Sequence, residues 1–100
     1  MIRDYQLTLA AAAKRLSDVY TGGATAANDI PYRQVLLQAE GADAFIGGSD
    51  AVTASAYGTK VDSTELLPVV LGPFDQGPIK LSDLWAAGAG ATLHITGIPF

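Results

Sequence analysis

The stretch Tyr32–Glu40, with the sequence YRQVLLQAE, is the clearest strand in the chain. Val35, Leu37 and Ala39 fall on one side of an extended backbone, while the other side is polar except for Leu36. A period of two residues with one apolar face is typical of a half-buried strand in an antiparallel sheet. We therefore expect a fold built from strands of this kind.

The same alternation recurs near both ends of the chain, at Asp4–Leu9 and at Ala91–Ile98. Between them, turn residues recur roughly every 8–12 positions, as in sandwiches and barrels. Shorter strands are predicted at Ala44–Ile46, Thr59–Val61 and Val69–Leu71. The prediction is an all-β chain that forms a small antiparallel β-sandwich, jelly-roll-like or Ig-like, with residues 1–100 as a single domain.

Two tight turns in the sequence predict hairpins. Gly41–Asp43 would connect the first strand described to Ala44–Ile46. Gly88–Gly90 would connect Leu84–Ala87 to the last strand of the chain. Because short connections usually join antiparallel neighbours, each pair is expected to lie side by side in one sheet.

Ala10–Tyr20 allows two interpretations. Ala13 and Leu16 are spaced as on one face of a helix, and Ala has the highest helix propensity. However, no strong N-cap precedes the run, and it is only two or three turns long. An extended segment around Lys14–Ser17 is preferred, and one short helix near residues 10–18 is the alternative.

The composition argues against several classes of protein. The chain is 49% hydrophobic and 16% charged, which excludes a disordered chain. Its net charge of −4 argues against nucleic-acid partners, and the absence of Cys excludes disulfides and thiolate zinc sites. No apolar run reaches the roughly 18 residues of a membrane span, so we expect no membrane partner. The run Leu7–Ala13 is interrupted and short for a cleaved signal, and none is expected.

The residue types that commonly carry catalysis are few. His94 is the single histidine, on the polar side of the last strand, where we expect it to face solvent or a cross-strand partner. Asp43 with Asp50, and Asp62 with Glu65, are the closest carboxylate pairs for calcium or for glycoside hydrolysis, but they lack the ligand spacing of an EF-hand. We interpret them as turn residues. The sequence predicts no catalytic, metal-binding or cofactor-binding residue, and no enzyme.

Three features bear on contacts. Trp85 is interpreted as an anchor of the core, with an interface residue as the alternative. The adjacent pair Lys14-Arg15 is expected on a solvated face or in an intersubunit salt bridge. Phe100 is aromatic, whereas chain ends are usually polar, so we expect it to be covered by its own fold or by a neighbouring molecule.

Three stretches carry a resemblance: Ile30–Ala39 (IPYRQVLLQA), Ala44–Val52 (AFIGGSDAV) and Gly72–Leu84 (GPFDQGPIKLSDL). Their order resembles that of small virion structural proteins of tailed bacteriophages. In that group a strand is followed by an F/Y-I-G-G-S-D-V-T hairpin, a G-P segment and a final hairpin. The resemblance covers roughly Tyr32–Ile98, and the alanine run at Ala10–Ala13 has no place in it.

The resemblance implies a non-enzymatic capsid cement, or decoration, protein. Such a protein would lie on the outer surface of the phage particle, bind the lattice of the major capsid protein and self-associate as a homotrimer. Two alternatives stay open. One is a phage neck, tail or host-recognition component. The other is a carbohydrate-binding β-sandwich, whose aromatic platform would come from Tyr5, Tyr20, Tyr32, Tyr57 and Trp85.

The loops at one end of the sandwich are the predicted interface with the lattice. Thr21–Pro31 and Gly72–Pro78 are long and rich in Gly and Pro, and connecting loops gather at sandwich ends. Proline stiffens such loops and lowers the entropy lost on docking. The predicted contact residues are Asn28, Asp29, Pro31, Tyr32, Gly72, Pro73, Phe74, Asp75, Gly77 and Phe100.

Overall fold

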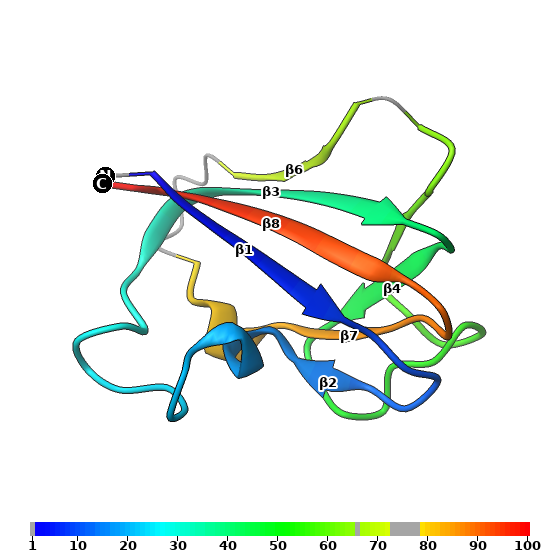
Figure 1. Cartoon of the computed structure of the whole chain (residues 1–100), viewed down its shortest axis with the longest axis horizontal. Helices are drawn as coiled ribbons and strands as arrows, with labels where there is room; N and C mark the ends of the chain where they lie inside the picture. Colours follow the sequence, from blue (N-terminus) through cyan, green and yellow to red (C-terminus); the bar gives the residue numbers. More distant parts are fainter. Residues whose placement is uncertain (1, 66, 73–78) are drawn as a thin grey trace.

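Eight strands and two short 3-10 helices are present in the computed structural model, which describes residues 2–65, 67–72 and 79–100 (Figure 1). The helices are η1 (Leu16–Val19) and η2 (Leu81–Asp83). The strands are β1 (Arg3–Thr8), β2 (Lys14–Arg15), β3 (Tyr32–Glu40), β4 (Ala44–Gly47), β5 (Thr59–Val61), β6 (Val69–Leu71), β7 (Trp85–Ala87) and β8 (Thr92–Pro99). The predicted all-β sandwich is confirmed. None of the described helices is long or apolar enough to cross a bilayer.

The strands form two four-stranded sheets with the orders β1-β8-β3-β6 (sheet 1) and β2-β7-β4-β5 (sheet 2). β1 pairs with β8, β2 with β7, β3 with β6 and β4 with β5, always antiparallel. The first four strands thus pair with the last four in reverse order, as in one long antiparallel hairpin that is rolled up. The pairs β3–β8 and β4–β7 then complete the two sheets. This is the jelly-roll arrangement, one of the two architectures that the sequence predicts.

Both predicted hairpins are wrong, for the same reason. β3 and β4 lie in different sheets, as do β7 and β8, so each tight turn carries the chain from one sheet to the other. The two crossovers pack against each other. Gly41 has a positive φ of 87°, and a Cβ there would lie 2.9 Å from the carbonyl oxygen of Gly90. A turn signal shows where the chain reverses, but it does not show which strand becomes the partner.

The segment between β1 and β3 combines both interpretations of residues 10–20. Lys14–Arg15 is extended and pairs with β7, which confirms the extended interpretation there. The helical part is a single 3-10 turn at Leu16–Val19, later in the chain than the predicted 10–18. Leu16 is fully buried, so its apolar side chain fixes this turn against the core.

The core lies between the inward faces of the two sheets. Val35 and Leu37 from β3 meet Leu93 and Ile95 from β8, all at most 1% exposed. The period-two alternation of β1, β3 and β8 is therefore confirmed. The remaining buried hydrophobic residues of this cluster are Leu7, Leu9, Leu16, Tyr20, Tyr32, Ala39, Ala44, Ile46, Val61, Ile79, Leu81, Ala86 and Ala91.

The outer face of sheet 2 carries a second, smaller apolar group. β4 and β7 have apolar residues on both faces, and the connection from β4 to β5 folds back over the outer one. The side chain of Val52 fills the space above Gly47, and the ring of Tyr57 lies 4.9 Å from that of Phe45. Trp85 is half-buried on this outer face and is not part of the core, so its interpretation as a core anchor is wrong.

Candidate docking surface at one end of the sandwich

The start of β1, the end of β8 and the loop 21–31 lie at the same end of the sandwich (left in Figure 1). Gly72 lies there too, beside the start of β3. Tyr32 pairs with Pro99 and with Ile79, and Gly72 approaches the carbonyl of Arg33. The predicted interface residues that the structure describes therefore lie at the same end of the sandwich. Pro73, Phe74, Asp75 and Gly77 lie outside the described residues.

Exposed apolar side chains mark this end. Phe100 is 77% exposed and Ile2 is 61% exposed, and both extend past the Arg3–Gly97 pair of β1 and β8. Pro31 is also exposed. Phe100 is therefore not covered by its own fold, and cover by a neighbouring molecule stays a prediction. Sequence reasoning missed Ile2, because its neighbours come from the opposite end of the chain.

Asn28 shapes its own loop. Its Oδ1 accepts the N–H of Thr25 at 2.7 Å, and its Nδ2 donates to the carbonyl of Gly23 at 3.0 Å. The Oγ1 of Thr25 in turn accepts the N–H of Asn28 at 3.3 Å. These bonds satisfy the loop internally, so Asn28 positions the surface rather than presenting a free side chain to a partner.

Asp29 connects the loop 21–31 to the helix η2 through a hydrogen bond. Its Oδ2 accepts the hydroxyl of Ser82 in η2 at 2.6 Å. The predicted contact residue Tyr32 is fully buried, so its side chain supports the surface from below and is not part of it. Its burial arises from a β-bulge in β3, which turns both Tyr32 and Val35 inward.

Three tyrosines, Tyr5, Tyr20 and Tyr32, pack together as a base at this end of the sandwich. The rings of Tyr5 and Tyr20 meet edge to face, with centroids 5.5 Å apart. The hydroxyls of Tyr20 and Tyr32 are buried side by side without a well-aligned hydrogen bond. Burial raises the pKa of both phenols above the ordinary value of 10.0, at which a tyrosine is already neutral at physiological pH. The base holds the loop and β3 together through packing rather than through charge.

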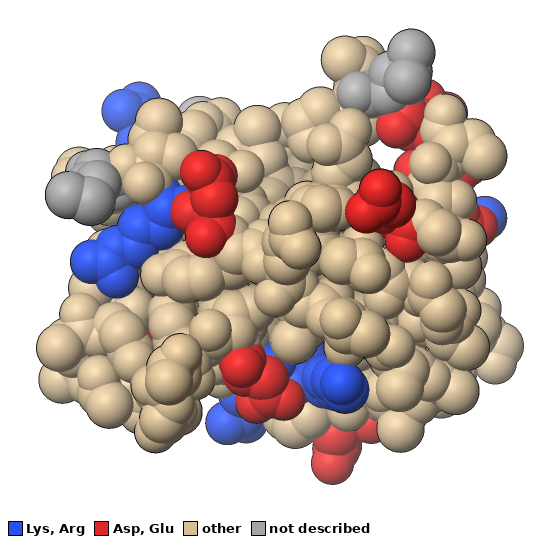
Figure 2. Space-filling model, in the orientation of Figure 1, with Lys and Arg blue, Asp and Glu red and all other residues tan. Residues whose placement is uncertain are grey.

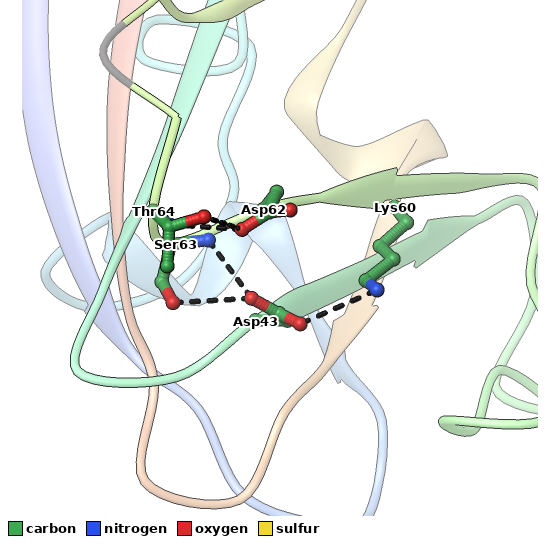
Figure 3. A network of polar contacts seen from close by, with 5 residues as sticks. All are labelled: Asp43, Lys60, Asp62, Ser63 and Thr64. Carbon is green, nitrogen blue, oxygen red and sulfur yellow. Dashed lines mark hydrogen bonds and ion pairs between the residues drawn. The ribbon is translucent and has the colours of Figure 1, made fainter.

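The carboxylates singled out in the sequence fix turns. Asp43 accepts the N–H of Ser63 at 2.8 Å and its hydroxyl at 3.1 Å, and Lys60 lies 3.4 Å away (Figure 3). Asp62 accepts the N–H and the hydroxyl of Thr64, two residues on. The predicted turn role is confirmed for Asp62, whereas Asp43 links its own turn to Ser63, twenty residues further along the chain. In the part of the chain that the structure describes, no cluster of His, Asp and Glu could hold a metal ion.

We expect Asp43→Asn to lower stability at pH 7 and to weaken the loss of stability in acid. Hydrogen bonds from Ser63 hold the pKa of Asp43 below its usual 3.8. A lowered pKa stabilises the fold at pH values above 3.8, and this contribution is lost as the pH falls through the lowered value. Urea denaturation at pH 7 and pH 3 measures the difference. Asp50→Asn, on an exposed turn, is the control, and equal pH dependence of both variants would contradict the assignment.

The outer face of sheet 1 carries a shallow groove of about 170 Å³. His94 lies in it and meets Glu40 across β8 and β3, with Nε2 3.1 Å from Oε1, so the expected cross-strand pairing is confirmed. Small-molecule sites usually measure roughly 300–1,000 Å³, which makes this groove too small for a typical substrate. The other lining residues are Leu36, Leu37, Gln38, Pro68 and Thr96.

The aromatic residues named for a carbohydrate platform are mostly inside the molecule. Tyr20 and Tyr32 are buried, and Tyr5 packs on Tyr20. Tyr57 is 47% exposed and Trp85 half-buried, and the guanidinium of Arg15 lies over the ring of Trp85, 4.7 Å from its centroid. Of the five residues named, only Tyr57 and Trp85 are therefore placed to contribute to a platform.

Charges on the face shown in Figure 2 are sparse, and Lys and Arg are scattered over a mostly uncharged surface. Comparison with protein-family models, curated proteins and solved structures found no match.

Proposed function

We propose that the chain is a non-enzymatic virion structural protein, a capsid cement or decoration protein of a tailed bacteriophage. It binds the lattice of the major capsid protein on the outer surface of the particle. It does so through the end of the sandwich that carries Ile2, Pro31 and Phe100, called the terminal surface below. It also self-associates, and the number of three subunits comes from the resemblance alone.

The observation that carries this proposal is the exposure of Ile2 and Phe100 beside a loop that is already ordered. Fully burying a large apolar side chain is worth roughly 1.5–3 kcal/mol. A pre-ordered loop loses little conformational entropy on docking, so more of that energy remains as affinity. The jelly-roll fold is shared by viral capsid and lectin domains, but this is an analogy of fold and not of function.

The mechanism needs no chemistry. A protein that binds the assembled lattice, and not its separated subunits, stabilises the assembled state by mass action. Each docked copy adds buried area where expansion of the shell would pull subunits apart. Stabilisation should therefore rise with the concentration of the protein.

The double variant Ile2→Asp/Phe100→Asp is expected to bind empty capsids of the parent phage about 100-fold more weakly than the wild type. Two lost apolar contacts of roughly 1.4 kcal/mol each give this factor. Cosedimentation with purified capsids measures it. Ala51→Asp, on an exposed turn away from the terminal surface, is the control and should bind as the wild type does.

If the double variant bound capsids as tightly as the wild type, the interface would not lie on the terminal surface. No binding of the wild-type protein to capsids would contradict the proposal itself and would favour the tail or carbohydrate-binding alternatives.

A further inference from the structure

The outer face of sheet 2 carries an aromatic surface formed by Arg15, Phe45, Tyr57 and Trp85, of which Arg15 and Tyr57 are exposed and Phe45 and Trp85 are half-buried. Arg15 of β2 lies opposite Trp85 of β7 in the sheet, and the ring of Tyr57 packs against that of Phe45 in β4. Trp, Tyr and Arg are the residues most enriched where protein interfaces hold their binding energy. Outward-facing sheet positions are normally polar, so this composition indicates a surface made for contact.

The aromatic surface carries one positive charge, that of Arg15, which is held by its ring contact with Trp85 and is not paired with a described carboxylate. The guanidinium of Arg15 stacks on this ring, 4.7 Å from its centroid. Stacking orders this side chain before any partner arrives, which lowers the entropy lost on binding. The partner of this surface should therefore offer a carboxylate next to apolar side chains.

The same chain offers such a surface at the start of β6. Leu67 is 79% exposed and Val70 is 46% exposed, at the edge of sheet 1. Glu65 is exposed two residues before Leu67, and the carboxylate of Glu40 meets His94 rather than Lys or Arg. These four residues, Glu40, Glu65, Leu67 and Val70, are called the β6 corner. Its glutamates make no ion pair with a described Lys or Arg.

We propose that the aromatic surface of one copy binds the β6 corner of a second copy. Charge complementarity selects this arrangement, because Arg15 would meet Glu40 or Glu65 while the rings of Tyr57 and Trp85 cover Leu67 and Val70. A contact between two aromatic surfaces would bring arginines together, and one between two β6 corners would bring glutamates together. The contact is therefore heterologous, joining two different surfaces.

A heterologous contact has a consequence for assembly. It builds closed rings when its rotation closes, whereas a contact between identical surfaces gives twofold dimers. A cyclic trimer therefore requires a contact of the heterologous kind. This inference rests on the self-association proposed above, and it uses a different surface from the one proposed for the lattice.

The test uses two variants that each lose one surface. Arg15→Glu removes the aromatic surface and Leu67→Asp removes the β6 corner, so each alone should sediment as a monomer where the wild type is oligomeric. Mixed in equal amounts, they should form a one-to-one dimer, because one intact surface of each kind remains. Sedimentation velocity at a series of concentrations measures all four samples. Lys80→Glu, an exposed charge reversal elsewhere, should assemble as the wild type does.

Circular dichroism of each variant separates loss of association from loss of folding, and Tyr57→Asp replaces Arg15→Glu if the latter unfolds. A monomeric wild type would overturn the proposal, as would self-association that persists in both variants. Two monomeric variants that fail to combine would show a contact between identical surfaces and would also overturn it. Capsid binding by folded monomeric variants reports on the lattice proposal separately, because the terminal surface is intact in both.

Discussion

Gly97→Ala should lower the free energy of unfolding by about 2 kcal/mol, although it adds a single methyl group. A Cβ at Gly97 would lie 2.5–2.8 Å from three ring atoms of Tyr32, closer than carbon atoms can approach. Tyr32 is fully buried in the core, so its ring has no free space to move into. The methyl group can be accommodated only by displacing β3 from β8, which also disturbs the terminal surface.

Urea denaturation of the wild type and the variant measures this effect. Gly48→Ala is the matched control, because a Cβ at Gly48 meets no atom within 4 Å. It should change stability by less than about 0.5 kcal/mol. If Gly97→Ala were as stable as the wild type, Tyr32 would not lie under β8, and the proposed base of the terminal surface would be wrong.

Leu37→Ala should cost about 3 kcal/mol, whereas Leu36→Ala, one residue earlier, should cost about 1 kcal/mol. Leu37 is fully buried between the sheets, while Leu36 is half-buried on the outer face of sheet 1. The removed atoms are the same in both variants, so the difference reports only the face on which each residue lies. A shift of β3 by one residue would exchange the two effects.

Thermal unfolding gives a second readout of this pair, since 1 kcal/mol corresponds to roughly 4–8 °C in Tm for a domain of this size. Equal costs for the two variants would contradict the register of β3 between β6 and β8.

The long strands could be predicted because their signal is local. β1, β3 and β8 each have one apolar and one polar face, and the structure buries the apolar one. The partners of these strands could not be read in the same way. In this fold β1 pairs with β8, from the other end of the chain. The turns at 41–43 and 88–90 each connect strands of different sheets. Such pairing depends on the whole fold and not on the turn itself.

The same limit applies to the candidate surfaces. The Gly and Pro content of residues 21–31 and of the segment that begins at Gly72 predicts loops there. Their shared place at one end of the sandwich follows from the antiparallel pairing of β3 with β6. The burial of Tyr32 was not predictable, because it depends on a bulge in β3. The position of Trp85 on the outer face of sheet 2 depends on its pairing opposite Arg15, which no local pattern reveals.

The most direct test of the proposed cement function is a cryo-electron microscopy map of empty capsids, from the phage that the proposal assigns the protein to, saturated with the protein. The account predicts sandwich-shaped density on the outer surface of the shell, with the terminal surface, marked by Ile2 and Phe100, against the capsid protein. Density in which these residues point away from the shell, or a particle in which the protein lies only on the tail, would contradict it.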